Sequence, residues 1–220
     1  GLGKAKYILK PGGTLGDLYT NSDLVYNDDG YIEVDKNGNV AVKDDYMDDI
    51  YLGSVFPKYN LAWRNDFNYK GINLGVLFTA RIGGICYSAT QANMDLYGVS
   101  EASAAARDAG GVMINGRDMI DAQKWYQVIG SQSGLPQYYT YSATNVRLQE
   151  LSLGYTLPSK WFRDKMRMTV SFVGRNLWMI YCKAPFDPEA VASTGMNYQG
   201  IDYFMMPSMR NLGFNVKFQF

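Results

Sequence analysis

Residues 211–220, at the carboxyl end of the chain, alternate strictly between polar and apolar side chains. The apolar positions are Leu212, Phe214, Val216, Phe218 and Phe220, and the positions between them hold polar residues or glycine. Because side chains in a β-strand alternate with a period of two, the two sets face opposite sides of one strand. The sequence therefore predicts a final strand with one apolar and one polar face.

The same alternation recurs upstream in residues 59–69, 72–82, 145–157 and 166–180. The segment 145–157 changes phase, because Val146 and Leu148 are even-numbered whereas Leu151 and Leu153 are odd-numbered. We interpret this change as a β-bulge near Gln149–Glu150 or as an upper half that no longer faces lipid. The regular stretches have the length of about 9–11 residues that a tilted strand needs to cross a bilayer. Strands of soluble proteins are usually about 5–6 residues long.

The connections between these segments alternate between short and long. Only Lys70–Gly71 separates the first two segments, and only residues 158–165 separate the next two, whereas residues 83–144 and 181–208 form long connections. Outer-membrane barrels have short periplasmic turns and long extracellular loops. We therefore predict an all-β fold, made of the C-terminal antiparallel strands of a large transmembrane β-barrel. Five strands do not close a barrel, which needs at least about eight, so we expect a piece of a larger barrel rather than an assembly of copies.

The expected organisation follows from the strands. We expect a polar extracellular region with the end of a preceding strand (1–57), a barrel hairpin (58–83), a long extracellular loop with short helices (84–142), a second hairpin (143–180), an extracellular loop (181–208) and the C-terminal strand (209–220). Ser100 is a suitable N-cap for a helix over 101–109, and a second helix is expected from about Asp121 to Gly130.

The two faces of the strands have different expected roles. The apolar set of the last strand would face lipid and present the strand to the barrel-assembly machinery. The opposite face would point toward a plug or an aqueous lumen, and it carries the charged residues Arg64, Arg81, Arg167, Arg175 and Lys217. Such charges more often form salt bridges with the plug or the wall than they touch substrate.

Composition removes several classes of function. The chain has no histidine, which excludes imidazole bases, His-containing catalytic triads and His-ligated metal sites. With 21 basic and 21 acidic residues it has no net charge that would favour nucleic acid. Asp187 and Glu189 are two positions apart in an expected extended segment, which would point their carboxylates apart, so we predict no enzyme, no cofactor and no metal. Residues 27–32 resemble a degenerate calcium loop, but hairpin turns explain them better.

Two further features leave alternatives open. Cys86 and Cys182 are either two free thiols or a disulfide between loops. Aromatic residues in the loops either contact substrate or a lid protein, or pack the loop on itself, and the candidates for contact are Trp125, Tyr138, Tyr139 and Tyr198.

A family resemblance becomes visible in residues 145–158, whose sequence NVRLQELSLGYTLP resembles a segment of SusC/RagA-type TonB-dependent outer-membrane transporters. Residues 174–178 (GRNLW) and 186–189 (FDPE) resemble two further segments of that family, and residues 27–32 and 53–61 resemble it more weakly. The resemblance implies a plugged barrel in the outer membrane of a Gram-negative bacterium. Such a barrel imports oligosaccharides or peptides with energy delivered by TonB, and a SusD-like lipoprotein forms its lid.

This chain would correspond to the C-terminal strands only, with TonB contacted through an N-terminal part outside this sequence. Residues 1–4 show no apolar signal segment, so we expect the beginning of the protein to lie upstream. The alternative from another class is a soluble β-rich surface or carbohydrate-binding module without transport activity.

Overall fold

The computed structural model describes residues 4–44, 49–131, 134–163, 165–193, 195 and 198–219. It divides into two compact units. The first contains Gly1–Phe56, Gly84–Ser142 and Val191–Met205, and the second contains Pro57–Gly83, Ala143–Ala190 and Met206–Phe220. The chain passes between the units repeatedly, so each unit is built from segments that are far apart in sequence.

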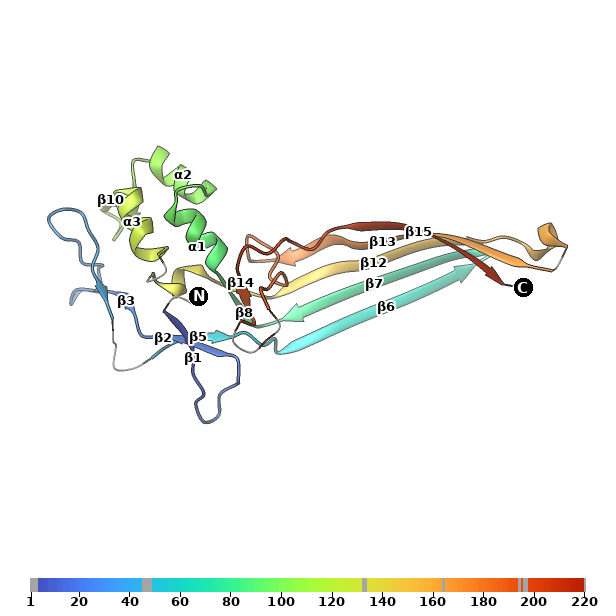
Figure 1. Cartoon of the computed structure of the whole chain (residues 1–220), viewed down its shortest axis with the longest axis horizontal. Helices are drawn as coiled ribbons and strands as arrows, with labels where there is room; N and C mark the ends of the chain where they lie inside the picture. The colour runs from blue at the N-terminus through green and yellow to red at the C-terminus, as the bar shows by residue number, and fades with distance from the viewer. Residues whose placement is uncertain are drawn as a thin grey trace. The chain divides into compact units, whose positions relative to one another are not determined.

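The second unit is a five-stranded antiparallel sheet with the order β15-β13-β12-β7-β6 (Figure 1). Its strands are β6 (Tyr59–Tyr69), β7 (Ile72–Ile82), β12 (Asn145–Thr156), β13 (Arg167–Cys182) and β15 (Asn211–Gln219). The predicted bounds of β6 and β7 are confirmed to the residue, and those of β12 and β13 to within two residues. The predicted last position of β15, Phe220, lies outside the described residues.

The turn between β6 and β7 explains why this hairpin is so regular. Lys70 and Gly71 both have positive φ, +49° and +88°, which is the backbone of a two-residue type I′ turn that matches the twist of the strands. A Cβ atom on Gly71 would lie 2.9 Å from the carbonyl oxygen of Thr156. Glycine is therefore required there both by the backbone angle and by the close approach of the neighbouring strand.

The change of phase in β12 is a bulge. Leu148 lies opposite Phe78 and Leu151 lies opposite Val76, with a register shift between Leu148 and Glu150. Phe78 and Val76 point to the same side of β7, so the apolar residues before and after the bulge point to one face of the sheet. The bulge interpretation is confirmed, and the alternative, that one half of the strand turns its apolar side away, is wrong.

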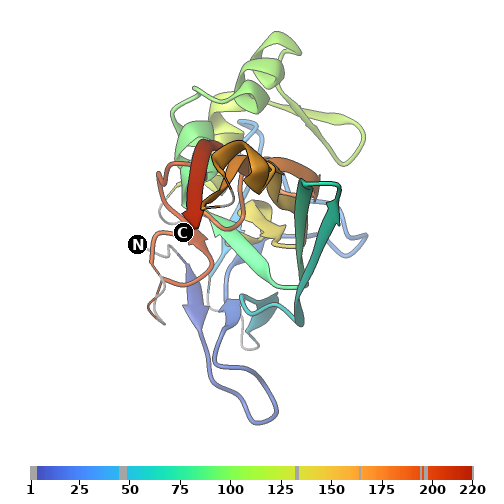
Figure 2. The ribbon, with the colours of Figure 1, turned by 90° about the vertical axis from the view of Figure 1, so that its right-hand side faces the viewer.

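The first unit combines small sheets with short helices. Its strands are β1 (Ala5–Tyr7), β2 (Asp17–Thr20) and β5 (Ile50–Ser54); β3 (Asp23–Leu24) and β4 (Val42–Lys43); β8 (Ile85–Ser88), β11 (Thr140–Ser142) and β14 (Ile201–Asp202); and β9 (Val112–Ile114) and β10 (Asp118–Ile120). Its helices are α1 (Ala89–Leu96), α2 (Glu101–Asp108) and α3 (Ala122–Ile129), which lie together in the upper part of Figure 2, and the 3₁₀ turn η1 (Pro136–Tyr139).

Both predicted helices are present, and the predicted N-cap Ser100 is confirmed. The Ser100 hydroxyl accepts the Ser103 N–H at the start of α2, and the Asp121 carboxylate accepts the Lys124 N–H at the start of α3, which ends at Gly130. Helix α1, capped by Ser88, was not predicted, because its apolar positions are too few to form a periodic stripe.

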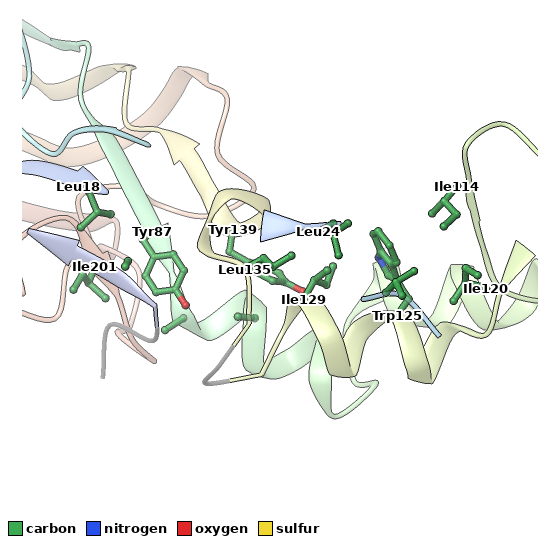
Figure 3. Close-up of a cluster of buried hydrophobic side chains, with 14 residues drawn as sticks. Leu18, Leu24, Tyr87, Ile114, Ile120, Trp125, Ile129, Leu135, Tyr139 and Ile201 are labelled. Atoms are coloured by element: carbon green, nitrogen blue, oxygen red, sulfur yellow. The ribbon is translucent and has the colours of Figure 1, made fainter. Parts of the chain in front are cut away.

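The hydrophobic core belongs to the first unit. Figure 3 shows a row of buried side chains that includes Leu18, Leu135, Trp125 and Ile114. No disulfide joins Cys86 and Cys182, so of the two alternatives for these cysteines the disulfide is wrong. Among the described residues, no helix is both long and apolar enough to cross a bilayer.

Candidate functional site

The charged residues expected to face a lumen lie on one face of the five-stranded sheet. Directly paired residues share a face, and the pairs Arg64–Leu77, Leu77–Glu150 and Glu150–Arg175 carry that face from β6 to β13. The same face contains Arg81 (opposite Asn60 and Asn145), Arg167 (opposite Gln219) and Lys217 (opposite Thr169). The structure thus brings all five predicted positions together on one polar surface.

Glu150 organises the middle of this polar face. Its carboxylate accepts a hydrogen bond from Arg175 Nε at 2.9 Å and forms an ion pair with Arg64 Nη1 at 3.4 Å. Arg64 also pairs with Asp66, with Nε and Oδ2 2.9 Å apart. Sequence analysis did not select Glu150, although a lone acid between two arginine-bearing strands is a signal of cross-strand pairing. The side chains of Arg64 and Arg175 are more than half exposed, so each pair is worth at most about 1 kcal/mol.

The opposite face of the sheet carries large apolar side chains, many of which are exposed among the described residues. Along the terminal strand β15, Leu212, Phe214, Val216 and Phe218 are between 42% and 74% exposed. Trp63 on β6 and Phe172 on β13 are 62% and 49% exposed. In a soluble β-sandwich, side chains of this size are interleaved with a second layer, which removes them from water. Exposed aromatic side chains on one face of a sheet are expected where that face contacts the hydrocarbon chains of lipids instead of water.

A buried arginine lies on the polar face, near the end of the sheet where the long connections begin. Arg147 on β12 is only 2% exposed. Its guanidinium forms a bidentate ion pair with Asp187, donates to Ser208 Oγ at 3.1 Å and donates from Nε to Asn145 Oδ1 at 3.1 Å. A buried guanidinium is stable only when its donors are satisfied in this way, because an unpaired buried charge is costly.

The three segments that carry the family resemblance each contribute to this cluster. Arg147 comes from 145–158, Asn176 from 174–178 and Asp187 from 186–189. Asn176 has φ +52°, accepts from Arg147 Nη1 at 3.4 Å and donates to the Ser208 carbonyl at 3.0 Å. Asparagine tolerates this left-handed conformation better than most residues, which explains its use in the middle of a strand. The resemblance therefore marks one structural contact between two strands and two loops.

The expected geometry of the Asp187–Glu189 pair is wrong. Ala190 N–H donates to the Asp187 carbonyl at 3.1 Å, so the segment is a turn rather than an extended strand. As a result both carboxylates converge on Arg147, with Glu189 Oε2 3.3 Å from Arg147 Nη2. Burial works to raise the pKa of Asp187, but hydrogen bonds from Arg147 and Ser208 outweigh it and hold that pKa below its usual value.

Most of the loop aromatics selected as contact residues are instead part of the core. Trp125 and Tyr139 are 7% and 2% exposed, and Tyr138 is half-buried with its ring edge-on to Trp125 at 5.8 Å. Burial raises the pKa of both tyrosines. The burial of these three side chains favours the other alternative, that they pack the loop on itself, and their contact with substrate or a lid protein stays a prediction. The sequence signal that we missed is the helical spacing of Ala122, Trp125 and Ile129. This spacing places the three side chains on one buried face of α3. Tyr198 is 50% exposed and stays a candidate.

A polar pocket lies in the first unit, where the segment 27–41 meets the β9–β10 hairpin. The segment contains two turns of the same design. The Asn27 side-chain oxygen accepts from the N–H groups of residues 29 and 31, and Asp35 accepts from those of residues 37 and 39. Gly30 and Gly38 follow at φ +80° and +74°. The predicted hairpin turns at 27–32 are thus confirmed.

An antiparallel sheet that is charged on one face and aromatic on the other, with strands joined alternately by tight turns and long connections, is typical of part of a membrane β-barrel. No family model matches the chain. The chain is 25% identical over 198 residues to "TonB-dependent receptor P3" of Formosa agariphila, an alignment that covers 86% of this chain and 19% of that protein.

Three solved structures share the fold. The RagAB peptide importer in its open-open state has a TM-score of 0.58 at 14% identity and matches 93% of this chain and 23% of that chain. Its closed-closed state gives a TM-score of 0.52 at 16% identity, and a further RagAB peptide transporter structure gives 0.56 at 15%, each covering 98% of this chain and 24% of that chain. The resemblance to SusC/RagA-type TonB-dependent transporters is confirmed. This chain spans about a fifth to a quarter of these proteins, and they are a receptor and transporters rather than enzymes.

Proposed function

We propose that this chain forms part of the wall and the extracellular loops of an outer-membrane TonB-dependent active transporter that imports oligosaccharides or peptides. The observation that supports it best is the two-faced sheet, with exposed aromatics on one side and five aligned basic residues on the other. A surface of that kind is stable when lipid covers the aromatic side and water or a plug covers the charged side.

The edges of the sheet support the same proposal. Strands β6 and β15 each have one sheet neighbour among the described residues, and an open strand edge is not tolerated in hydrocarbon. In a longer protein these edges would pair with further strands. Residues 212–220 would then be the strand that the barrel-assembly machinery recognises. Arg64, Arg81, Arg167, Arg175 and Lys217 would line the lumen or contact the plug.

The proposed partners follow from the family resemblance. A SusD-like lipoprotein would close the extracellular mouth above the loops that form the first unit, and TonB would act through a part of the protein outside this chain. The RagAB structures are named as peptide importers, which supports a peptide substrate, whereas the resemblance also implies oligosaccharides.

The test uses cells that produce the native protein. An antibody against residues 27–41 should label intact cells, and the protein should fractionate with the outer membrane and require detergent for extraction. Deletion of the gene, or of tonB, should abolish concentrative uptake of one substrate class, either labelled oligosaccharides or labelled peptides. A detergent-free, soluble protein whose loss leaves both uptakes unchanged would contradict the proposal in favour of a soluble surface module.

A further inference from the structure

The pocket of the first unit has the size and mixed lining of a binding site for a small polar molecule. Its volume is about 680 Å³, within the range typical of ligand pockets. One part of its lining is apolar and contains Ile32, Val34 and the buried Val40. The remainder is polar and contains carboxylates, amides and a guanidinium. A ligand with both an apolar surface and many hydrogen-bonding groups would use both parts.

The walls of the pocket are fixed in place before any ligand binds. Asn115 accepts the Ile32 N–H and donates to the Ile32 carbonyl, both at 2.9 Å, which joins the β9–β10 turn to the 27–41 segment. The same amide donates to Asp118 at 3.0 Å. Asn115 and Gly116 have φ of +54° and +69°, as a type I′ turn requires. A pocket held in this way loses little conformational entropy when it is filled.

The polar groups offer both acceptors and donors. Asp118 uses one oxygen for Asn115, which leaves lone pairs on both oxygens, because a carboxylate has about four acceptor sites. The Glu33 N–H donates to the Val25 carbonyl at 2.9 Å, but the Glu33 carboxylate makes no hydrogen bond or ion pair with the residues that the structure describes. Arg117 lies over the ring of Tyr31 at 5.0 Å and adds donors beside an aromatic ring that is 42% exposed.

Three classes of ligand can be compared with this lining. Within the described ranges no group of three or more His, Cys, Asp or Glu side chains is placed to hold a metal ion. A cationic peptide would meet Arg117, and Asp35 is already engaged by two N–H groups and by the Asn39 amide at 2.9 Å. A hydroxyl group both donates and accepts, so a ring of neighbouring hydroxyls with an apolar C–H face matches every part of the lining.

We infer that this pocket binds a neutral saccharide unit, with Tyr31 and the apolar side chains against the ring and Glu33, Asp118 and Arg117 on the hydroxyls. The inference rests on the proposed function and selects oligosaccharides from its two substrate classes. It places an extracellular recognition site in the loops of this chain.

The experiment uses the full-length transporter purified in detergent. The probes are fluorescently labelled oligosaccharide pools from starch and β-mannan and a fluorescently labelled tryptic digest of casein, and binding is followed by fluorescence polarisation. Tyr31→Ala and Glu33→Gln should each weaken binding of at least one saccharide pool about tenfold or more. The matched controls Tyr97→Ala and Glu101→Gln change exposed residues of the same unit outside the pocket and should leave binding unchanged.

Saccharide binding that both pocket variants leave unchanged would overturn the inference. It would also be overturned if the unmodified protein bound neither saccharide pool, or if only peptide binding responded to the variants. In each of these cases TonB-dependent uptake by cells would still support the proposed function. Failure of the proposed function would be recognised separately, because cells that produce the unmodified protein would then show no TonB-dependent uptake.

Discussion

The two units of this chain distribute polar and apolar side chains in opposite ways. In the first unit, large apolar residues such as Leu18, Leu135 and Trp125 are buried, as in a protein folded in water. In the second unit, the buried apolar side chains among the described residues are small ones, those of Ala143, Ala184 and Pro188, while Arg147 is almost fully buried. The first unit is therefore stabilised by its own core. The second depends on backbone pairing, on one buried ionic cluster and on whatever covers its aromatic face.

The largest expected effect comes from breaking the buried cluster of the second unit. Arg147→Ala would leave Asp187 buried without its charge partner, and removal of one member of a buried ion pair costs about 3–5 kcal/mol. We expect a correspondingly lower free energy of unfolding of the full-length barrel, measured by urea titration in detergent. The matched control Arg175→Ala removes an exposed pair with Glu150 and should cost less than about 1 kcal/mol. Equal losses in the two variants would show that Arg147 is not a structural centre.

A change of similar size should act on the first unit through its core. Trp125→Ala removes a buried indole and should destabilise that unit by about 3–5 kcal/mol. The readout is the rate at which protease cleaves the first unit on intact cells, with Tyr198→Ala as an exposed control. If Trp125→Ala kept protease resistance but abolished substrate uptake, the result would instead support a role of Trp125 in substrate contact.

The next largest effect tests which face of the terminal strand contacts lipid. Phe214→Arg places a charge on the face assigned to lipid, at a cost of about 2–4 kcal/mol if the position is near the bilayer midplane. Asn215→Arg places the same charge on the polar face. We expect the first variant to reduce the amount of heat-modifiable, assembled barrel in the outer membrane far more than the second. Equal assembly of both would contradict the assignment of the faces.

The smallest effect is a pH dependence of the ionic cluster. The pKa of Asp187 is lowered in the folded protein, chiefly because the hydrogen bonds from Arg147 and Ser208 outweigh the opposing effect of burial. A lowered folded pKa contributes stability above the unfolded value of about 3.9, and that stability is lost as pH falls through the folded value. The difference in unfolding free energy between the native protein and Asp187→Asn should therefore be constant near neutral pH and shrink below about pH 4. A difference that grows on acidification would reverse the sign of this linkage.

The strands and both predicted helices followed from local patterns, but two contacts between distant segments did not. A period of two defines each strand wherever its partner lies, and a serine or aspartate followed by a helical stretch defines a cap from adjacent residues alone. The convergence of Arg147, Asn176 and Asp187 required the register of β12 against β13 and the turn after β13. The pocket around Tyr31 required the β9–β10 hairpin to meet a segment more than eighty positions upstream, through Asn115 and Ile32.

The sequence by itself determined the two-faced strands, the alternation of short and long connections, and the resemblance to a transporter family. These are properties of order and spacing along the chain. Only the tertiary structure decided which aromatics are buried and which are bare. Trp125 and Trp178 are the same residue type, yet one lies in the core at 7% exposure and the other on the open sheet at 60%. The physical reason is that burial depends on what lies across from a side chain: remote segments cover Trp125, whereas the described residues leave more than half of Trp178 exposed.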